Sequence, residues 1–131
     1  MFLGIDLGTS ALKVILIDED QSLLGEISIP IQVKRPQPLW SEQDPDLWWK
    51  AVIKAVQFLK TNKFFKDIKG IGLSGQMHGA VLLDKKGKIL RPAILWNDGR
   101  SEKECEELEE KEPDLKSITG NLAMPGFTAP K

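Results

Sequence analysis

Near its start the chain carries an acid, a glycine and two hydroxyls in close succession, a combination suited to binding phosphate. In GIDLGTSALK, residues 4–13, Asp6 stands two positions before Gly8, which is followed by Thr9, Ser10 and, further on, Lys13. Glycine lets the backbone turn tightly, so that N–H groups near Gly8, Thr9 and Ser10 can point at one anion. The two hydroxyls add neutral donors, and Lys13 can add a positive charge.

Asp6 fits beside a phosphate if a cation lies between the two negative groups. Mg²⁺ commonly binds one or two carboxylates together with phosphate oxygens, directly or through water. This arrangement is usual in enzymes that transfer phosphoryl groups. An ordinary β-turn, in which Asp6 bonds its own backbone, fits the same residues. The stretch alone therefore permits a phosphate site with Mg²⁺ and does not identify a substrate.

The stretch SGQMHGA, residues 74–80, gathers polar and adaptable side chains between two glycines. Gln76 and His78, the single histidine of the chain, can each donate and accept hydrogen bonds, and Met77 offers an adaptable apolar wall. This mixture suits a small polyol with an apolar carbon backbone. A histidine in a β-turn that binds nothing is an equally good interpretation.

A third candidate, ILWNDGR, covers residues 94–100. Trp96 can present a flat face to sugar C–H groups, and Asn97 and Asp98 can bind hydroxyls, although Trp96 also suits a hydrophobic core. Arg100 is expected to pair with a nearby acid. Trp40 lies in a loop and is the other tryptophan that a carbohydrate site could use.

The elements that would position these residues begin with three strands. Short apolar stretches rich in β-branched residues predict strands at 2–6, 11–17 and 23–33, with Pro30 at an edge or a bulge. Because the turns between them are short, an antiparallel meander is expected.

A helix and a fourth strand follow. Asp44 and Pro45 are typical of a helix start, as N-cap and first-turn residue. The segment NKFFKD ends this helix, and residues 68–75 predict a strand that stops at a glycine. The helix is expected to face the core through four residues at helical spacing, namely Trp48, Val52, Ala55 and Leu59.

Shorter elements are expected beyond residue 78. The stretches 79–84 and 88–92 flank the turn KKG and predict a hairpin. Ser101 with Glu104 forms a capping-box pattern that opens an acidic helix across 101–111.

The resulting order, β-β-β-α-β, differs from the strict β-α-β alternation of a Rossmann fold. It is the order expected of a ribonuclease-H-like half-domain, as in actin-like ATPases and sugar kinases. We therefore expect an α/β domain with a mixed sheet. The closing stretch NLAMPGFTAPK, residues 121–131, stops between elements, so a truncated domain of a longer protein is expected.

Composition narrows the class of protein. The chain has 131 residues, 41% hydrophobic and 28% charged, which is typical of a soluble domain. A net charge of −1 gives no reason to expect a nucleic-acid partner. Cys105 is the single cysteine, which suits a cytoplasmic location. No stretch has the length of a membrane span, so no membrane partner is expected.

Taken together, these stretches resemble the N-terminal part of the FGGY carbohydrate kinase family, and most of all its members that act on xylulose. The resemblance covers nearly the whole chain in the family's order, and SGQMHG followed by WNDGR is its most specific part. The matching stretches are GIDLGTS, PLWSEQDP with WW after it, SGQMHGA, LRPAILWNDGR and ITGNLAMPGFTAPK.

The resemblance implies a two-domain kinase that transfers the γ-phosphate of MgATP to the 5-hydroxyl of D-xylulose, in a cleft between ribonuclease-H-like domains. Full-length relatives are expected to dimerise. Asp6 would be the active-site acid near Mg²⁺ and the γ-phosphate. The phosphate contacts would come from the turn, through Gly8, Thr9, Ser10 and Lys13. The sugar contacts would come from Gln76, Met77, His78, Trp96, Asn97 and Asp98.

The same resemblance implies that residues 1–131 are one part of the family's N-terminal domain. The catalytic base and most of the adenosine site would lie outside this chain, so the chain alone should not turn over. Two alternatives stay open. One is a kinase for another sugar or polyol, such as ribulose, gluconate or glycerol; the other is a non-catalytic module that binds sugar or nucleotide.

Overall fold

The computed structural model describes all residues from 1 to 131. These residues form two compact units. Met1–Gln32 and Pro45–Gln76 form the first unit, and Val33–Asp44 and Met77–Lys131 form the second. None of the helices has the length and apolar character needed to cross a bilayer.

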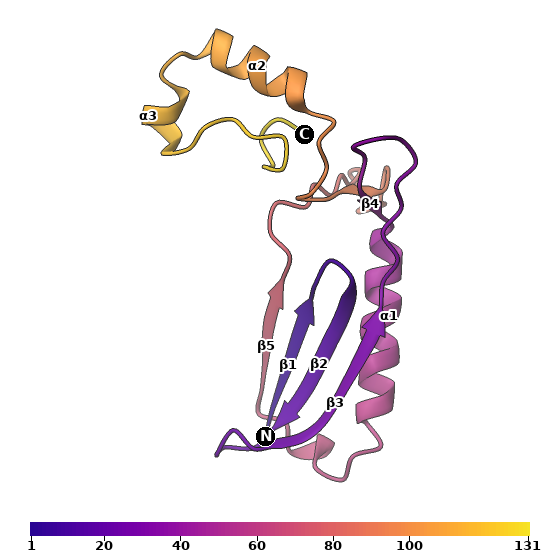
Figure 1. Ribbon diagram of the computed structural model, residues 1–131. Helices are drawn as coiled ribbons and strands as arrows, with labels where there is room; N and C mark the ends of the chain where they lie inside the picture. The colour runs from indigo at the N-terminus through magenta and orange to yellow at the C-terminus, as the bar shows by residue number, and fades with distance from the viewer. The chain divides into compact units, whose positions relative to one another are not determined.

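The first unit contains a four-stranded mixed sheet (Figure 1). Its strands are β1 (Phe2–Leu7), β2 (Ala11–Ile17), β3 (Leu23–Pro30) and β5 (Gly70–Gly75), in the order β3-β2-β1-β5. The first three pair antiparallel, which confirms the predicted meander, and β5 pairs parallel with β1. The strand predicted to reach residue 33 ends at Pro30, on the edge strand, where the missing N–H is tolerated.

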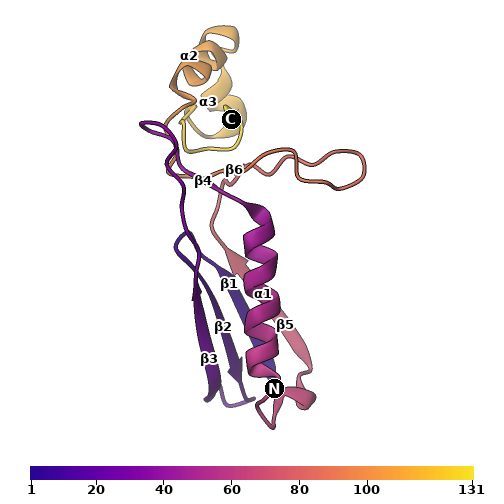
Figure 2. The same ribbon diagram turned by 90° about the vertical axis from the view of Figure 1, so that its right-hand side faces the viewer.

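Helix α1 (Pro45–Leu59) covers one face of this sheet (Figure 2). It begins at Pro45, as predicted, and a short 3₁₀ turn, Phe65–Asp67, follows it. Trp48 and Val52 pack at the margin of the core, so the predicted core face is confirmed. The core consists of buried aliphatic side chains from the sheet, the helix and the segment after β3: Leu3, Leu12, Val14, Leu16, Ile31, Ala51, Ala55 and Leu59.

The second unit has little regular structure. Strand β4 (Glu42–Gln43) pairs antiparallel with β6 (Ala93–Ile94), and two helices follow, α2 (Glu102–Lys111) and α3 (Leu115–Thr119). The predicted acidic helix is thus confirmed as α2, whereas α3 was not predicted. Helix α3 is followed by Gly120 as its C-cap, whose φ of 74° is a left-handed conformation that favours glycine.

The hairpin predicted after β5 is present as a loop without regular strands, which extends away from β6 (Figure 2). One isolated bridge joins Leu83 to Ile89 across it. Its turn is fastened by Asp84, whose carboxylate accepts hydrogen bonds of 2.8 Å from the backbone N–H groups of Lys86 and Lys88. The turn was therefore predicted correctly from its residues, but the flanking apolar residues do not pair enough to form strands.

The capping box predicted between Ser101 and Glu104 is not formed. Ser101 precedes α2 but makes no side-chain hydrogen bond to the helix. Its backbone, at φ −90° and ψ 25°, lacks the extended conformation from which an N-cap side chain reaches the first free N–H groups. Ser101 contributes its carbonyl instead, which accepts a 3.0 Å bond from the N–H of Cys105.

Candidate functional site

The predicted phosphate site lies at the end of β1 in the first unit. Asp6 stands directly opposite Lys13 on β2 and Ser74 on β5, so all three side chains share one face of the sheet. They line a depression of about 500 Å³ on that face. The Asp6 side chain is exposed and forms no hydrogen bond or ion pair within the chain. Its carboxylate is therefore free to bind a cation or water.

The turn after β1 depends on Gly8. The Gly8 N–H donates a 3.0 Å hydrogen bond to the carbonyl of Ala11, and a Cβ at Gly8 would lie 3.1 Å from that oxygen, which is unusually tight. Because the turn itself uses this N–H, it is not one of the donors that a phosphate could take. The carbonyl of Ser10 accepts a 2.8 Å bond from Ile31, which fixes the turn to the segment after β3.

Gln76 is bonded to this turn. The Thr9 hydroxyl donates a 3.1 Å hydrogen bond to the Gln76 side-chain oxygen, and the Gln76 N–H donates a 2.8 Å bond to the carbonyl of Leu7. The structure thus places Gln76, which was expected to contact the sugar, beside a residue expected to contact phosphate. Gln76 therefore holds the Thr9 side chain in one rotamer, and the hydroxyl, which has a single proton, would exchange this bond for one to a phosphate oxygen.

Lys13 lies on the same sheet face as Asp6, but its ammonium pairs with another acid. Lys13 Nζ is 3.6 Å from a carboxylate oxygen of Glu26 on β3, and both side chains are more than half exposed. Exposed pairs of this kind contribute little to stability, so the ammonium can leave Glu26 at small cost when a phosphate binds.

The donor set around Asp6 fits Mg²⁺ held mainly by a substrate. No group of three or more His, Cys, Asp or Glu side chains in the chain could hold a metal ion. Mg²⁺ does not need such a cage, since it is usually bound by one or two carboxylates together with phosphate oxygens and water. Asp6 alone therefore suffices as a protein ligand, provided that a phosphate brings the remaining oxygens.

The second unit carries His78 in an unusual backbone conformation. Its φ is 59°, in the left-handed region that residues other than glycine seldom adopt. The imidazole stacks on the ring of Phe127, with 4.6 Å between centroids and 27° between planes. The neighbouring Met77 is 66% exposed. Both predicted sugar contacts are thus accessible, and one face of the histidine ring is occupied by an aromatic residue that was not predicted.

Asp98 is buried and bonded on all sides, unlike the sugar-binding acid that was expected. Its carboxylate accepts hydrogen bonds from the N–H of Ser41 (2.5 Å) and from Nε and Nη2 of Arg100 (2.8 and 2.6 Å). Burial by itself would raise the pKa of Asp98, but these bonds outweigh it and hold the pKa below its usual value. With 2% of Asp98 exposed, no oxygen is left for a sugar hydroxyl.

Arg100 pairs with acids, as predicted, and it is the centre of a buried ionic network. Besides Asp98, it contacts Glu42, whose Oε1 lies 2.8 Å from Nη1 of Arg100 and 2.7 Å from Nη2 of Arg91. The guanidinium also lies 3.6 Å over the ring of Trp40. This face of the Trp40 ring is therefore closed to a sugar.

The network holds the loop from which Trp96 and Asn97 project. The Leu95 N–H donates a 3.0 Å bond to the carbonyl of Ser41, and Asp98 fixes the other end of the loop. Trp96 is 47% exposed and Asn97 is exposed, so both side chains are accessible, as a sugar contact requires.

Sequence reasoning missed the residues that support these side chains. Phe127 and Lys131 belong to GFTAPK, a stretch that contributes to the resemblance but has no spacing that indicates a site. Ser74 was passed over because its position opposite Asp6 depends on strand register. Glu42 and Arg91 are 49 residues apart, and one sequence gives no signal that they pair.

All 131 residues match the FGGY family of carbohydrate kinases, N-terminal domain. The xylulose kinase of Escherichia coli K12 is 53% identical over 131 residues, which are 100% of this chain and 27% of that protein. The crystal structure of a "xyloylose kinase" from Brucella ovis superposes with a TM-score of 0.91 and 53% identity, over 98% of this chain and 27% of the other.

A more distant structure has nearly the same fold. Glycerol kinase from Plasmodium falciparum, solved with ADP, matches with a TM-score of 0.89 and 28% identity, over 98% of this chain and 27% of that one. These likenesses confirm the predicted actin-like fold class. The chain spans about a quarter of the length of each of these relatives.

Proposed function

The chain belongs to the FGGY family of carbohydrate kinases, and we propose that the full-length protein carrying it transfers the γ-phosphate of ATP to D-xylulose, forming D-xylulose 5-phosphate. The observation that supports this most directly is the 53% identity to a xylulose kinase over the whole chain. Because the chain makes up 27% of that xylulose kinase, it would supply one part of the active site.

On the phosphate side, Asp6 would hold Mg²⁺, directly or through water, and Thr9, Ser10 and Lys13 would contact the transferred group. The exposed, unbonded carboxylate of Asp6 and the accessible Lys13 support this assignment. Mg²⁺, when bound, neutralises charge on the phosphate oxygens during transfer. Gly8 shapes the turn, and Thr9, held by Gln76 until ATP binds, would exchange that hydrogen bond for one to the phosphate.

On the sugar side, the side chains of the second unit suit an uncharged polyol. His78 can donate and accept hydrogen bonds with neighbouring hydroxyls through its two nitrogens. Asn97 can do the same through its amide, while Met77 and Trp96 present apolar surface to the C–H groups. Asp98 would act on the sugar indirectly, by fixing the loop that carries Trp96 and Asn97.

The base that takes the proton from the sugar hydroxyl would lie outside this chain, as would most of the adenosine site. Two acids of the chain are already engaged, since Glu42 and Asp98 are both paired with arginine side chains. A carboxylate held in this way is a poor general base, because binding a proton would break its ion pair.

A substrate panel tests this proposal and its alternatives. The full-length protein would be assayed for ADP formation with xylulose, ribulose, gluconate and glycerol at saturating ATP. We expect kcat/KM for xylulose to exceed the others by at least about tenfold, a difference of about 1.4 kcal/mol in transition-state binding. Preference for another sugar would reassign the substrate. Binding without ADP formation would favour the non-catalytic module.

The proposal also covers the partners, location and oligomeric state of the full-length protein. Its partners would be ATP, Mg²⁺ and a small sugar, with neither nucleic acid nor membrane, and its location would be the cytoplasm. A homodimer is proposed for the full-length protein on the family resemblance alone, and sedimentation velocity of that protein would test it.

A further inference from the structure

Two residues that the proposed function does not use hold His78 in place, namely Lys131 and Phe127. We propose that they are positioning residues: Lys131 fixes the backbone of His78, and Phe127 fixes its ring, so that the imidazole meets the sugar in one orientation. This inference rests on the proposed function for its consequence in catalysis. The contacts that carry it all lie within the second unit.

Lys131 bridges two loops through their backbones. Its ammonium donates hydrogen bonds to the carbonyl of His78 (2.7 Å) and to the carbonyl of Gly126 (2.8 Å). Burial lowers the pKa of Lys131, as expected for an ammonium partly withdrawn from water. Hydrogen bonds from a charged donor are the strong ones, so this side chain joins the His78 loop firmly to the loop that follows α3.

The backbone of His78 needs such support. At a φ of 59° a residue with a Cβ is strained, and strained residues persist where the surrounding structure holds them. The bond from Lys131 acts on the carbonyl of this residue, adjacent to the strained torsion. Glycine would adopt the same φ without strain, so the presence of histidine here indicates that the side chain serves a purpose.

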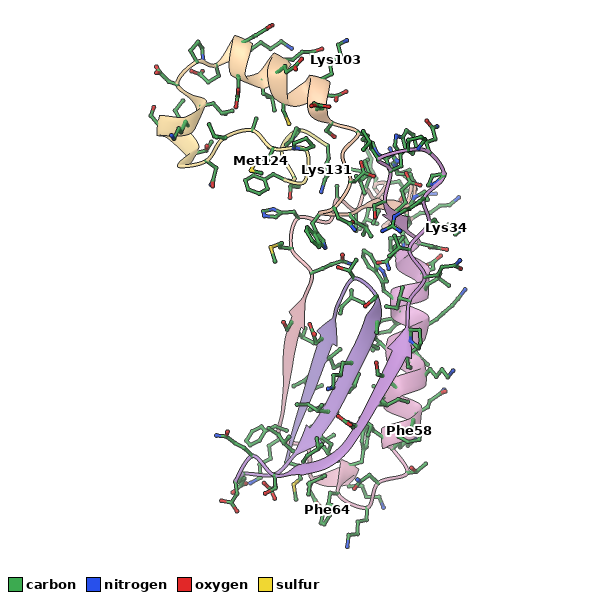
Figure 3. All side chains as sticks on the ribbon, viewed as in Figure 1. Lys34, Phe58, Phe64, Lys103, Met124 and Lys131 are labelled. Atoms are coloured by element: carbon green, nitrogen blue, oxygen red, sulfur yellow. The ribbon has the colours of Figure 1, made fainter.

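Phe127 restricts the ring of His78. Stacking at 4.6 Å covers one face of the imidazole and limits its rotation, while both ring nitrogens lie at the edge, where a hydroxyl can reach them. Phe127 is itself held by a turn, since its N–H donates a 2.8 Å bond to the carbonyl of Met124. Figure 3 shows Met124 and Lys131 in the loop that follows α3.

The same loop also contacts the backbone of Trp96. A Cβ at Gly126 would collide with the Trp96 carbonyl oxygen, so the backbone at Gly126 approaches Trp96 more closely than any other residue could. One loop therefore positions both His78 and the residue proposed as the wall of the sugar pocket. Loosening it should weaken sugar binding without changing the phosphate turn, which belongs to the first unit.

Steady-state kinetics of the full-length enzyme test the proposal. We expect Lys131→Met to raise the KM for xylulose roughly tenfold, which corresponds to about 1.4 kcal/mol, with the KM for ATP within about twofold. Lys131→Arg keeps charged donors and should restore most of the sugar affinity. Lys116→Met is the matched control, because Lys116 is an exposed lysine of α3 in the same unit, and it should leave both constants unchanged.

A second readout does not depend on activity. It is the proton NMR spectrum of His78, whose imidazole C–H signals are assigned by their loss in His78→Asn. The Phe127 ring should shield these protons, so their chemical shifts should move downfield in Phe127→Leu. They should move in Lys131→Met as well, but not in Lys116→Met. If wild-type protein fails to phosphorylate xylulose, the proposed function fails, and these shifts still decide whether the two residues position His78.

Two results would overturn the inference. One is a Lys131→Met variant in which the KM for xylulose does not rise, or rises only as much as the KM for ATP. A lysine with a merely structural role would not affect the sugar alone. The other is an unchanged His78 signal in Phe127→Leu.

Discussion

Asp6 is the acid of the first turn, and its carboxylate is free of bonds within the chain, so its replacement should affect phosphate transfer and not folding. In Asp6→Asn of the full-length enzyme we expect kcat to fall by about 10² or more, a size typical of losing one electrostatic contact to the transition state. The KM for xylulose should change little. Steady-state assays would show this, with the exposed Asp20→Asn as control. Near-normal turnover would remove Asp6 from the mechanism.

Gln76 permits a sharper test, because its side chain is bonded to Thr9. If Gln76 orients the Thr9 hydroxyl, Gln76→Ala should lower kcat or raise the KM for ATP by about fivefold, the effect of one lost hydrogen bond worth about 1 kcal/mol. The effect should be absent when Thr9→Ala is already present, so a double-mutant cycle should give a coupling of about the same size. A rise confined to the KM for xylulose would instead return Gln76 to the sugar site.

At this scale the sequence identified candidate residues better than it assigned their roles. Asp98 and His78 both looked like sugar contacts, since their side chains can bind hydroxyls. The structure separates them, because Asp98 is bonded to Ser41, 57 residues earlier in the chain, and to Arg100. The chemistry of a side chain is visible in the sequence, but the partners that use up its hydrogen-bonding groups are brought to it by the fold.

Elements were predictable where the local pattern and the packing agree. The strands β1 and β2 are short apolar stretches that supply Leu3, Leu12, Val14 and Leu16 to the core, and α1 shows helical spacing with a proline at its start, so their positions followed from the sequence. The hairpin around Asp84 and the capping box at Ser101 depended instead on pairing and on local torsions. Such features depend on tertiary context, which a single sequence does not contain.

The pairing of β4 with β6 is reinforced by the ionic network, which makes Arg100 a stability determinant of the second unit. We expect Arg100→Met to lower the free energy of unfolding by about 3 kcal/mol, because it leaves the buried Asp98 without a cationic partner and Glu42 with Arg91 alone. Urea unfolding followed by tryptophan fluorescence would measure it, since Arg100 lies over the Trp40 ring. Lys69→Met, which breaks the exposed pair with Glu19, is the control and should leave the midpoint unchanged. An equal midpoint for both variants would contradict a stabilising network.

The same network predicts an acid-sensitive contribution to stability. The folded-state pKa of Asp98 lies below its unfolded value of about 3.9. Its contribution is therefore fully present above that value and is lost as the pH falls through the folded pKa. Urea midpoints measured from pH 7 to pH 3 should fall more steeply for wild type than for Asp98→Asn, which should be less stable at pH 7. Parallel curves would show that Asp98 does not titrate differently on folding.

In the whole molecule the candidate residues fall into two groups, one in each compact unit. The stretch SGQMHGA passes from one unit to the other, since Gln76 is the last residue of the first unit and Met77 begins the second segment of the other. The residues proposed for phosphate therefore belong to the sheet, and those proposed for sugar belong to the irregular unit held by the ionic network and by Lys131. Substitutions in the first unit should therefore act on ATP, and substitutions in the second unit should act on the sugar.

The last prediction concerns the 131-residue chain on its own, which should not phosphorylate xylulose. Phosphoryl transfer to a hydroxyl needs a base to accept its proton as well as a metal to neutralise charge. Asp6 is assigned to the metal, and the carboxylates of Glu42 and Asp98 are held by arginines. A coupled assay of the purified chain with MgATP and xylulose should therefore give no ADP above background, while the full-length enzyme under the same conditions turns over. Measurable phosphorylation by the short chain would contradict the assignment of the base to a residue outside it.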